Sequence, residues 1–136
     1  MSAPIENLIA DFELIDDWED RYRHLIELGR ALPAMEPALK TPSTKVNGCA
    51  SQVWIHSRAA AEHKLDLQGD SDALIVKGLI AVVFMLFAPM TASEIIAADA
   101  SAVFARLGLK DHLTPQRSNG LASMVARIKA DAAAAI

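Results

Sequence analysis

The segment from Ala73 to Phe87 constrains the fold more than any other part of the chain, because its side chains are apolar almost all the way round a helix. It reads ALIVKGLIAVVFMLF, and Lys77 is its only charged residue. The longest apolar run, residues 79–90, is shorter than the roughly 20 residues that a membrane span needs. A helix that is apolar all round is a buried one, so we expect this segment to cross the core of the domain.

Helices are also predicted before this segment. Residues 5–15 predict a short helix, and the D-x-x-E pattern of Asp16 and Glu19 predicts that a second helix begins there and ends near Leu32. Three prolines and a glycine make residues 33–48 a loop that crosses the surface.

The C-terminal part of the chain predicts three more helices from their capping residues and spacing. Thr91 and Glu94 form a T-x-x-E capping box, and residues 102–107 predict a short helix before a glycine. Thr114 followed by Pro115 predicts the start of the last helix, since proline fits the first helical position. The apolar stripe of that helix consists of Leu121, Met124, Val125 and Ile128.

Between the helical regions the hydrophobic period changes to that of strands. Residues 53–58 and 64–68 alternate along each segment and predict an antiparallel hairpin, to which Lys45 and Val46 add a short third strand. Ser71 or Asp72 is then expected to accept the free N–H groups at the start of the central helix. The order of elements predicts an α+β fold, with a small antiparallel sheet of about three strands packed against helices.

Composition narrows the class of protein. A chain of 136 residues without a linker is expected to form one domain over 1–136. Its net charge of −4, with no basic cluster, argues against nucleic-acid binding. The acidic N-terminus is not that of a signal peptide. A single cysteine cannot form an internal disulfide, which favours a reducing cytoplasm as the location.

That cysteine, Cys49, lies in the stretch VNGCASQVW, residues 46–54, where the sequence indicates a turn. A thiolate nucleophile needs access and stabilisation of its charge, and Gly48 lets the backbone bend tightly beside it. Three other interpretations stay open at this point: a small packing residue, the nucleophile of a hydrolase, and a metal ligand. Candidate bases for a hydrolase are His24, His56, His63 and His112, none of which lies in a recognisable signature.

Three blocks together resemble the SufE family of sulfur-acceptor proteins. They are VNGCASQVWI, LQGDSDALIVKGLIAVVF and HLTPQRSNGL, in the family's order and over essentially the whole chain. The motif cysteine of the family falls on Cys49. The resemblance implies an α+β fold similar to that of the IscU scaffold. The related CsdE branch has similar motifs, and these blocks do not separate the two.

The resemblance also implies partners. A SufS- or CsdA-like cysteine desulfurase, which holds pyridoxal phosphate, would supply sulfur as a persulfide, and a SufBCD-type iron–sulfur scaffold would receive it. This chain would hold no cofactor of its own. A carrier needs one reactive sulfur, whereas a scaffold needs several thiolates to hold iron, so a single cysteine favours the carrier. The competing functions are a cysteine-dependent hydrolase and a non-catalytic interaction module.

A persulfide benefits from shelter, which we expect from Val46, Val53 and the helix over 79–87. Burial opposes reactivity by raising a thiol's pKa, so we expect a loop at 47–51 that is sheltered at rest and swings outward in the partner's cleft. Gly48 and Ser51 are the supporting residues of that loop.

Other residues are expected to contribute around the site. Asp70 and Asp72 are either a solvated cap or part of the partner-facing surface. Arg117 lies in the first turn of the last helix, where a cation is disfavoured. It is either a surface arginine that reaches an acidic neighbour or a contact for an anion or the partner, and the resemblance implies the second, because Arg117 falls in the R-S-x-G block of the family. Trp54 is expected in the core. Gly78, costly inside a helix, is expected where another backbone approaches, with the cysteine loop as the candidate.

Overall fold

The predicted core helix is present as α3, Leu74–Phe87, in a computed structural model that describes residues 3–136. Ten of its 14 residues are buried. It is contacted by the neighbouring elements α1 (Ala3–Leu14), α2 (Trp18–Ala31), α7 (Pro115–Ala134) and β2 (Leu65–Ser71), which is why so few of its side chains are exposed. No helix among the described residues has the length and apolar character to cross a membrane.

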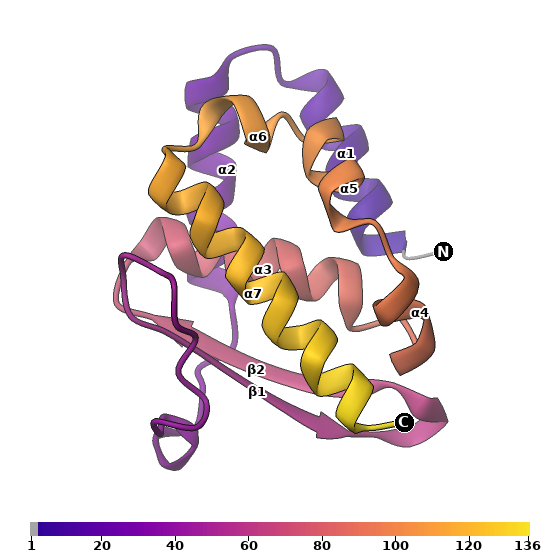
Figure 1. Ribbon diagram of the computed structural model, residues 1–136. Coiled ribbons are helices and arrows are strands. Elements are labelled where there is room, and N and C mark those ends of the chain that lie inside the picture. Colours follow the sequence, from indigo (N-terminus) through magenta and orange to yellow (C-terminus); the bar gives the residue numbers. More distant parts are fainter. Residues whose placement is uncertain (1–2) are drawn as a thin grey trace.

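The remaining helices form a shell around α3 (Figure 1). Their bounds are α1 (Ala3–Leu14), α2 (Trp18–Ala31), α4 (Ala92–Ala97), α5 (Ala100–Arg106), α6 (Leu109–His112) and α7 (Pro115–Ala134), with 3-10 turns at Pro37–Leu39 and Ala61–His63. The Thr91–Glu94 capping box and the Thr114 cap of α7 are both present as predicted. The single turn α6 was not predicted, because it directly follows Gly108, and a glycine after a helical pattern indicates a helix end. Gly108 has a φ of 75° and caps α6.

Two helix starts differ from the prediction. The cap of α2 is Asp17, one residue later than Asp16, and its side chain accepts the N–H of Glu19. The cap of α3 is Ala73, which supplies no side-chain acceptor, because strand β2 runs on through Ser71. The Ser71 hydroxyl does accept the N–H of Ala73, at 3.2 Å, but Asp72 turns away toward the cysteine loop.

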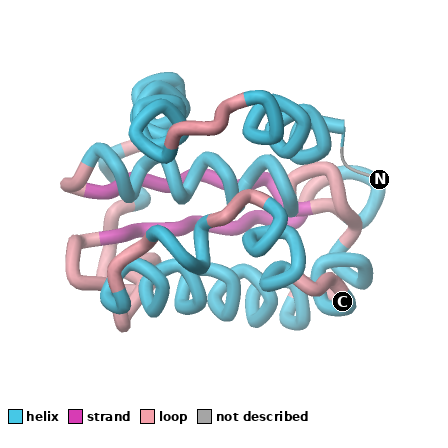
Figure 2. Tube along the Cα trace, turned by 90° about the horizontal axis from the view of Figure 1, so that it is seen from above, coloured by secondary structure: helices cyan, strands magenta, loops and turns pink. Residues whose placement is uncertain are grey.

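The sheet is an antiparallel hairpin of two strands, β1 (Val53–Ala59) and β2 (Leu65–Ser71), with Val53 opposite Ser71. The predicted third strand is wrong, since residues 45–46 make only one isolated bridge, from Lys45 to Trp54. The Pro-rich segment before it turns away too soon to pair further. The α+β fold class is nevertheless confirmed. In Figure 2 the long C-terminal helix runs parallel to the hairpin, and its contacts with the sheet are mainly with β1.

Gly78 marks a very close contact between two helices. A Cβ atom at Gly78 would lie 2.1 Å from the carbonyl oxygen of Leu25 in α2. The predicted approach of another backbone is therefore confirmed, but the neighbour is α2 and not the cysteine loop. The absence of a side chain lets α2 and α3 pack backbone to backbone.

Candidate functional site

Cys49 lies in a loop that connects the chain before the hairpin to β1. Gly48 has a φ of 92°, a conformation that other residues rarely adopt, and this turns Cys49 toward α7. The loop is closed at its base, where the N–H of Val46 donates to the carbonyl of Val53 at 2.8 Å. Asp72 accepts the N–H of Gln52 at 3.0 Å and holds the far end of the loop to the start of α3.

The surface beneath Cys49 is the N-terminal half of α7. The thiol is half-buried, and its Sγ donates to the backbone carbonyl of Gly120 at 3.6 Å, a weak hydrogen bond. A Cβ atom at Gly120 would lie 3.4 Å from Sγ, and one at Gly48 would lie 2.5 Å from the Ser123 hydroxyl. Both glycines let the loop lie close against the helix.

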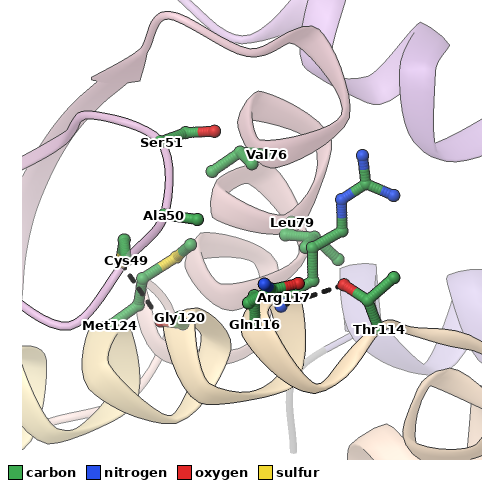
Figure 3. A pocket seen from close by; sticks show the side chains of 10 residues that line it. All are labelled: Cys49, Ala50, Ser51, Val76, Leu79, Thr114, Gln116, Arg117, Gly120 and Met124. Atoms are coloured by element: carbon green, nitrogen blue, oxygen red, sulfur yellow. Dashed lines mark hydrogen bonds between the residues drawn. The ribbon is translucent and has the colours of Figure 1, made fainter.

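Cys49 opens onto a cavity of about 270 Å³ between the loop, α3 and α7 (Figure 3). Its lining residues are Cys49, Ala50, Ser51, Val76, Leu79, Thr114, Gln116, Arg117, Gly120 and Met124. The apolar cover expected from Val46 and Val53 is absent, because both point into the core beneath the hairpin. The cover expected from the helix over 79–87 is confirmed at Leu79, and Val76 and Met124 supply the rest.

Burial raises the pKa of the Cys49 thiol above its ordinary value. The thiolate fraction of the resting protein at neutral pH is therefore small. Only the thiolate reacts with iodoacetamide, so the rate of Cys49 alkylation should rise with pH. We expect the midpoint of this rise to lie at a higher pH in the native protein than in the same chain unfolded in urea. Rates measured over the alkaline titration range by mass spectrometry check this. Equal midpoints in the two states would contradict a sheltered thiol.

Arg117 lines the same cavity as Cys49, but its guanidinium group is directed toward α2 (Figure 3). Its Nη1 donates to the Tyr22 hydroxyl at 3.2 Å, and the guanidinium carbon lies 5.9 Å from the centre of the Tyr22 ring. Its backbone N–H donates to the Thr114 hydroxyl as part of the helix cap. The first turn of α7 and this arginine thus form a positively charged wall on one side of the cavity.

The two aspartates have different surroundings. Asp70 pairs with Lys40 and, at 3.5 Å, with Lys77, and its side chain is 19% exposed. Burial raises the pKa of Asp70, but the Lys40 hydrogen bond, the N–H of Ser71 and the charges of both lysines outweigh it and lower the pKa overall. Asp70 is therefore an ion-paired structural residue outside the cavity and not a solvated cap. Asp72 is exposed beside the cysteine loop.

Trp54 does not pack in the core as predicted. It is half-buried on the face of β1 opposite Val53 and Ile55, and the Lys40 ammonium lies 5.4 Å from its ring centre. Alternation along the strand places its neighbours inward and leaves Trp54 on the outer face.

The four histidines lie outside the cavity. His24 packs edge-on against Phe12, His112 stacks on Trp18, His56 pairs with Gln68 across the hairpin, and His63 lies in the turn between the strands. None lines the cavity, and neither does any carboxylate. Within residues 3–136, no group of three or more His, Cys, Asp or Glu side chains could hold a metal ion.

Several residues of the site were missed in the sequence, above all Gly120, Met124 and Val76. Gly120 gave a signal that could have been used, because a glycine inside a long helix costs stability and indicates a close neighbour. Met124 and Val76 gave none, since apolar helix residues are expected in the core.

Comparison with known proteins agrees with this architecture. Residues 6–132 match the family model of SufE, described as an Fe-S metabolism associated domain. The chain belongs to the SufE family. An uncharacterized SufE-like protein of Rhizobium etli is 48% identical over 133 residues, covering 96% of this chain and 90% of that protein. An uncharacterized SufE-like protein of Rhizobium meliloti is 47% identical over 131 residues, covering 94% of each.

The fold of this SufE-family chain is also that of a solved structure. The solution structure of a hypothetical protein from Thermus thermophilus matches with a TM-score of 0.80 at 18% identity, over 99% of this chain and 97% of the other. At that identity the similarity concerns the fold alone. Membership of the SufE family associates the chain with iron–sulfur metabolism.

Proposed function

We propose that this chain is a sulfur acceptor and carrier, which takes persulfide sulfur onto Cys49 from a pyridoxal-phosphate-dependent cysteine desulfurase and stimulates that enzyme. It then passes the sulfur to an iron–sulfur scaffold of the SufBCD type. Family membership supports the link to iron–sulfur metabolism. The pyridoxal phosphate belongs to the desulfurase, which is SufS- or CsdA-like, and this chain works in the cytoplasm without a cofactor of its own.

The observation that carries the proposal is a single thiol in a cavity without a general base. The ten lining residues include no histidine, aspartate or glutamate. A cysteine hydrolase needs a base within hydrogen-bond reach of the nucleophile, so the surroundings of Cys49 disfavour that alternative. Sulfur transfer needs no such base, since it is an exchange between thiol and persulfide.

The transfer step balances without an oxidant or reductant. The Cys49 thiolate attacks the terminal sulfur of the desulfurase persulfide, a new S–S bond forms at Cys49, and the S–S bond of the enzyme breaks. The enzyme's cysteine leaves as a thiolate. The proton that Cys49 loses on ionisation goes to solvent. The persulfide anion of Cys49 would rest in the cavity, one wall of which is the positively charged N-terminal end of α7.

The resting geometry favours a movement of the loop in this step. The thiol faces α7 and is half-buried, with a raised pKa, whereas attack needs an exposed thiolate. We infer that the loop of residues 47–51 swings outward in the partner's cleft, with Gly48 absorbing the change in backbone angles. Hydrogen exchange of the loop amides, with and without desulfurase, tests this motion. Amides that stay fully protected in both states would contradict it.

The direct test is the intact mass of this chain after incubation with a cognate desulfurase and free cysteine. The carrier proposal requires a gain of one sulfur, about 32 mass units, that is removed by a thiol reductant. An unchanged mass would contradict the proposal. It would then favour the remaining alternative, an interaction module whose thiol is not used.

Arg117 is expected to contribute to transfer more than to stability. An Arg117→Ala variant should melt within a few degrees of wild type, because it loses one partly exposed hydrogen bond to Tyr22. We expect it to reduce desulfurase stimulation about tenfold at low partner concentration, because a charge-assisted contact has been removed. A Tyr22→Phe variant is the matched control, since it removes the hydroxyl but leaves the guanidinium in place. Normal stimulation by Arg117→Ala at all partner concentrations would make Arg117 a surface residue only.

A further inference from the structure

Arg127 bridges α7 to the chain segment that leads into the cysteine loop. Its Nη2 donates to the carbonyl of Ser43 at 2.7 Å, and its Nη1 reaches the carbonyl of Lys45 at 3.5 Å. These contacts join residues more than 80 positions apart in the chain. The segment 43–46, which we call the loop arm, ends two residues before Gly48.

The guanidinium of Arg127 is itself fixed. Its Nε donates to both carboxylate oxygens of Asp131, at 3.2 and 3.3 Å, and the Ser57 hydroxyl of β1 donates to the same carboxylate at 2.6 Å. The side chains of Arg127 and Asp131 are each 25% exposed. A planar guanidinium group held in this way can donate its remaining N–H groups to two carbonyls at once.

Backbone hydrogen bonds hold the loop arm on its opposite side. The N–H of Ile55 donates to the carbonyl of Thr44 at 2.9 Å, and that of Val46 donates to Val53, so the arm is attached to β1. On the side toward α7 lies a depression of about 350 Å³, lined by Lys45, Val46, Asn47, Ser123, Ala126 and Arg127. Arg127 lines this depression and reaches the loop arm from α7.

We propose that Arg127 is a positioning residue, which clamps the loop arm to α7 and so holds Cys49 against Gly120 in its sheltered state. Where the cysteine loop moves during sulfur transfer, the clamp marks the fixed end of that motion. Only this last consequence rests on the proposed function. The clamp itself concerns the resting protein, and it is measured without any partner.

The test is the rate of Cys49 alkylation by iodoacetamide in Arg127→Gln, with hydrogen exchange of the amides of residues 46–52 on the same sample. Loss of the clamp should increase the alkylation rate at about pH 8 roughly tenfold, because a loosened loop exposes the thiol and removes the burial that raises its pKa. Arg127→Lys keeps a positive charge beside Asp131 but lacks the planar guanidinium group that bonds to two carbonyls at once. It should therefore also alkylate faster than wild type.

Lys129 provides the matched control on the same helix. Its ammonium also donates to two backbone carbonyls, those of Ile96 and Ala98 at 3.2 and 2.5 Å, but on the side of α7 away from the cysteine loop. Lys129→Ala should lower the melting temperature as much as Arg127→Gln and leave Cys49 alkylation at the wild-type rate.

The outcomes separate a positioning role from a purely structural one. Faster alkylation and faster exchange at 46–52 in both Arg127 variants, but not in Lys129→Ala, support the clamp. A wild-type alkylation rate in Arg127→Lys and Arg127→Gln, or an equal increase in Lys129→Ala, overturns it. Sulfur transfer from a desulfurase does not enter this comparison, so failure of the clamp and failure of the carrier proposal remain distinguishable.

Discussion

A Cys49→Ser variant is expected to gain no sulfur when it is incubated with a cognate desulfurase and free cysteine, whereas the wild type gains about 32 mass units. The reason is that Cys49 is the only thiol in the chain, and a hydroxyl is not sufficiently nucleophilic toward a persulfide at neutral pH. Stimulation of the desulfurase should fall to the basal rate measured without this chain. Intact mass and sulfide release are the two measurements.

The fold of Cys49→Ser has to be shown intact for that result to count. The thiol is half-buried and makes one weak hydrogen bond, to the Gly120 carbonyl at 3.6 Å, so the loss of that bond costs little stability. We therefore expect the melting temperature to stay within a few degrees of wild type. A Ser51→Ala variant, changed two residues away in the same loop, should keep sulfur transfer. Sulfur found on Cys49→Ser would place the acceptor elsewhere and contradict the proposed role of the thiol.

Gly78→Ala is expected to cause a large loss of stability. The new Cβ would lie 2.1 Å from the Leu25 carbonyl oxygen, a backbone atom that can move only if α2 moves away from α3. The free energy of unfolding should fall by about 3 kcal/mol, which corresponds to roughly 10 °C in melting temperature. Urea denaturation followed by circular dichroism measures it.

Gly120→Ala is the matched control for that substitution. It also places alanine inside a long helix, but the new Cβ would meet only Cys49, at 3.4 Å from Sγ. Because alanine is preferred over glycine in a helix by about 1 kcal/mol, stability should be unchanged or slightly higher. If Gly120→Ala and Gly78→Ala changed stability equally, the close packing of α2 on α3 would not be the cause.

Local signals explain which parts of the fold could be predicted. The apolar segment that forms α3, the Thr91 capping box and the Thr114–Pro115 start of α7 are each encoded within a few neighbouring residues. Patterns of this kind depend on the spacing of apolar residues and on side chains that cap the backbone N–H groups a few residues away. They can therefore be recognised without knowledge of the rest of the chain. The predicted third strand failed because pairing beyond the Lys45–Trp54 bridge depends on the course of the Pro-rich segment before it, which the alternation of side chains does not encode.

The same distinction applies to the candidate site. The sequence by itself determined the candidate reactive atom, since Cys49 is the only thiol and follows a glycine in a turn. It also determined that Arg117 lies in the first turn of the last helix. Only the tertiary structure decided what surrounds the thiol: Gly120 as its floor, Val76 and Met124 as its cover, and Arg127 at the base of its loop. The physical reason is that these contacts join segments tens of residues apart, and packing of α7 against the loop and α3 brings them together.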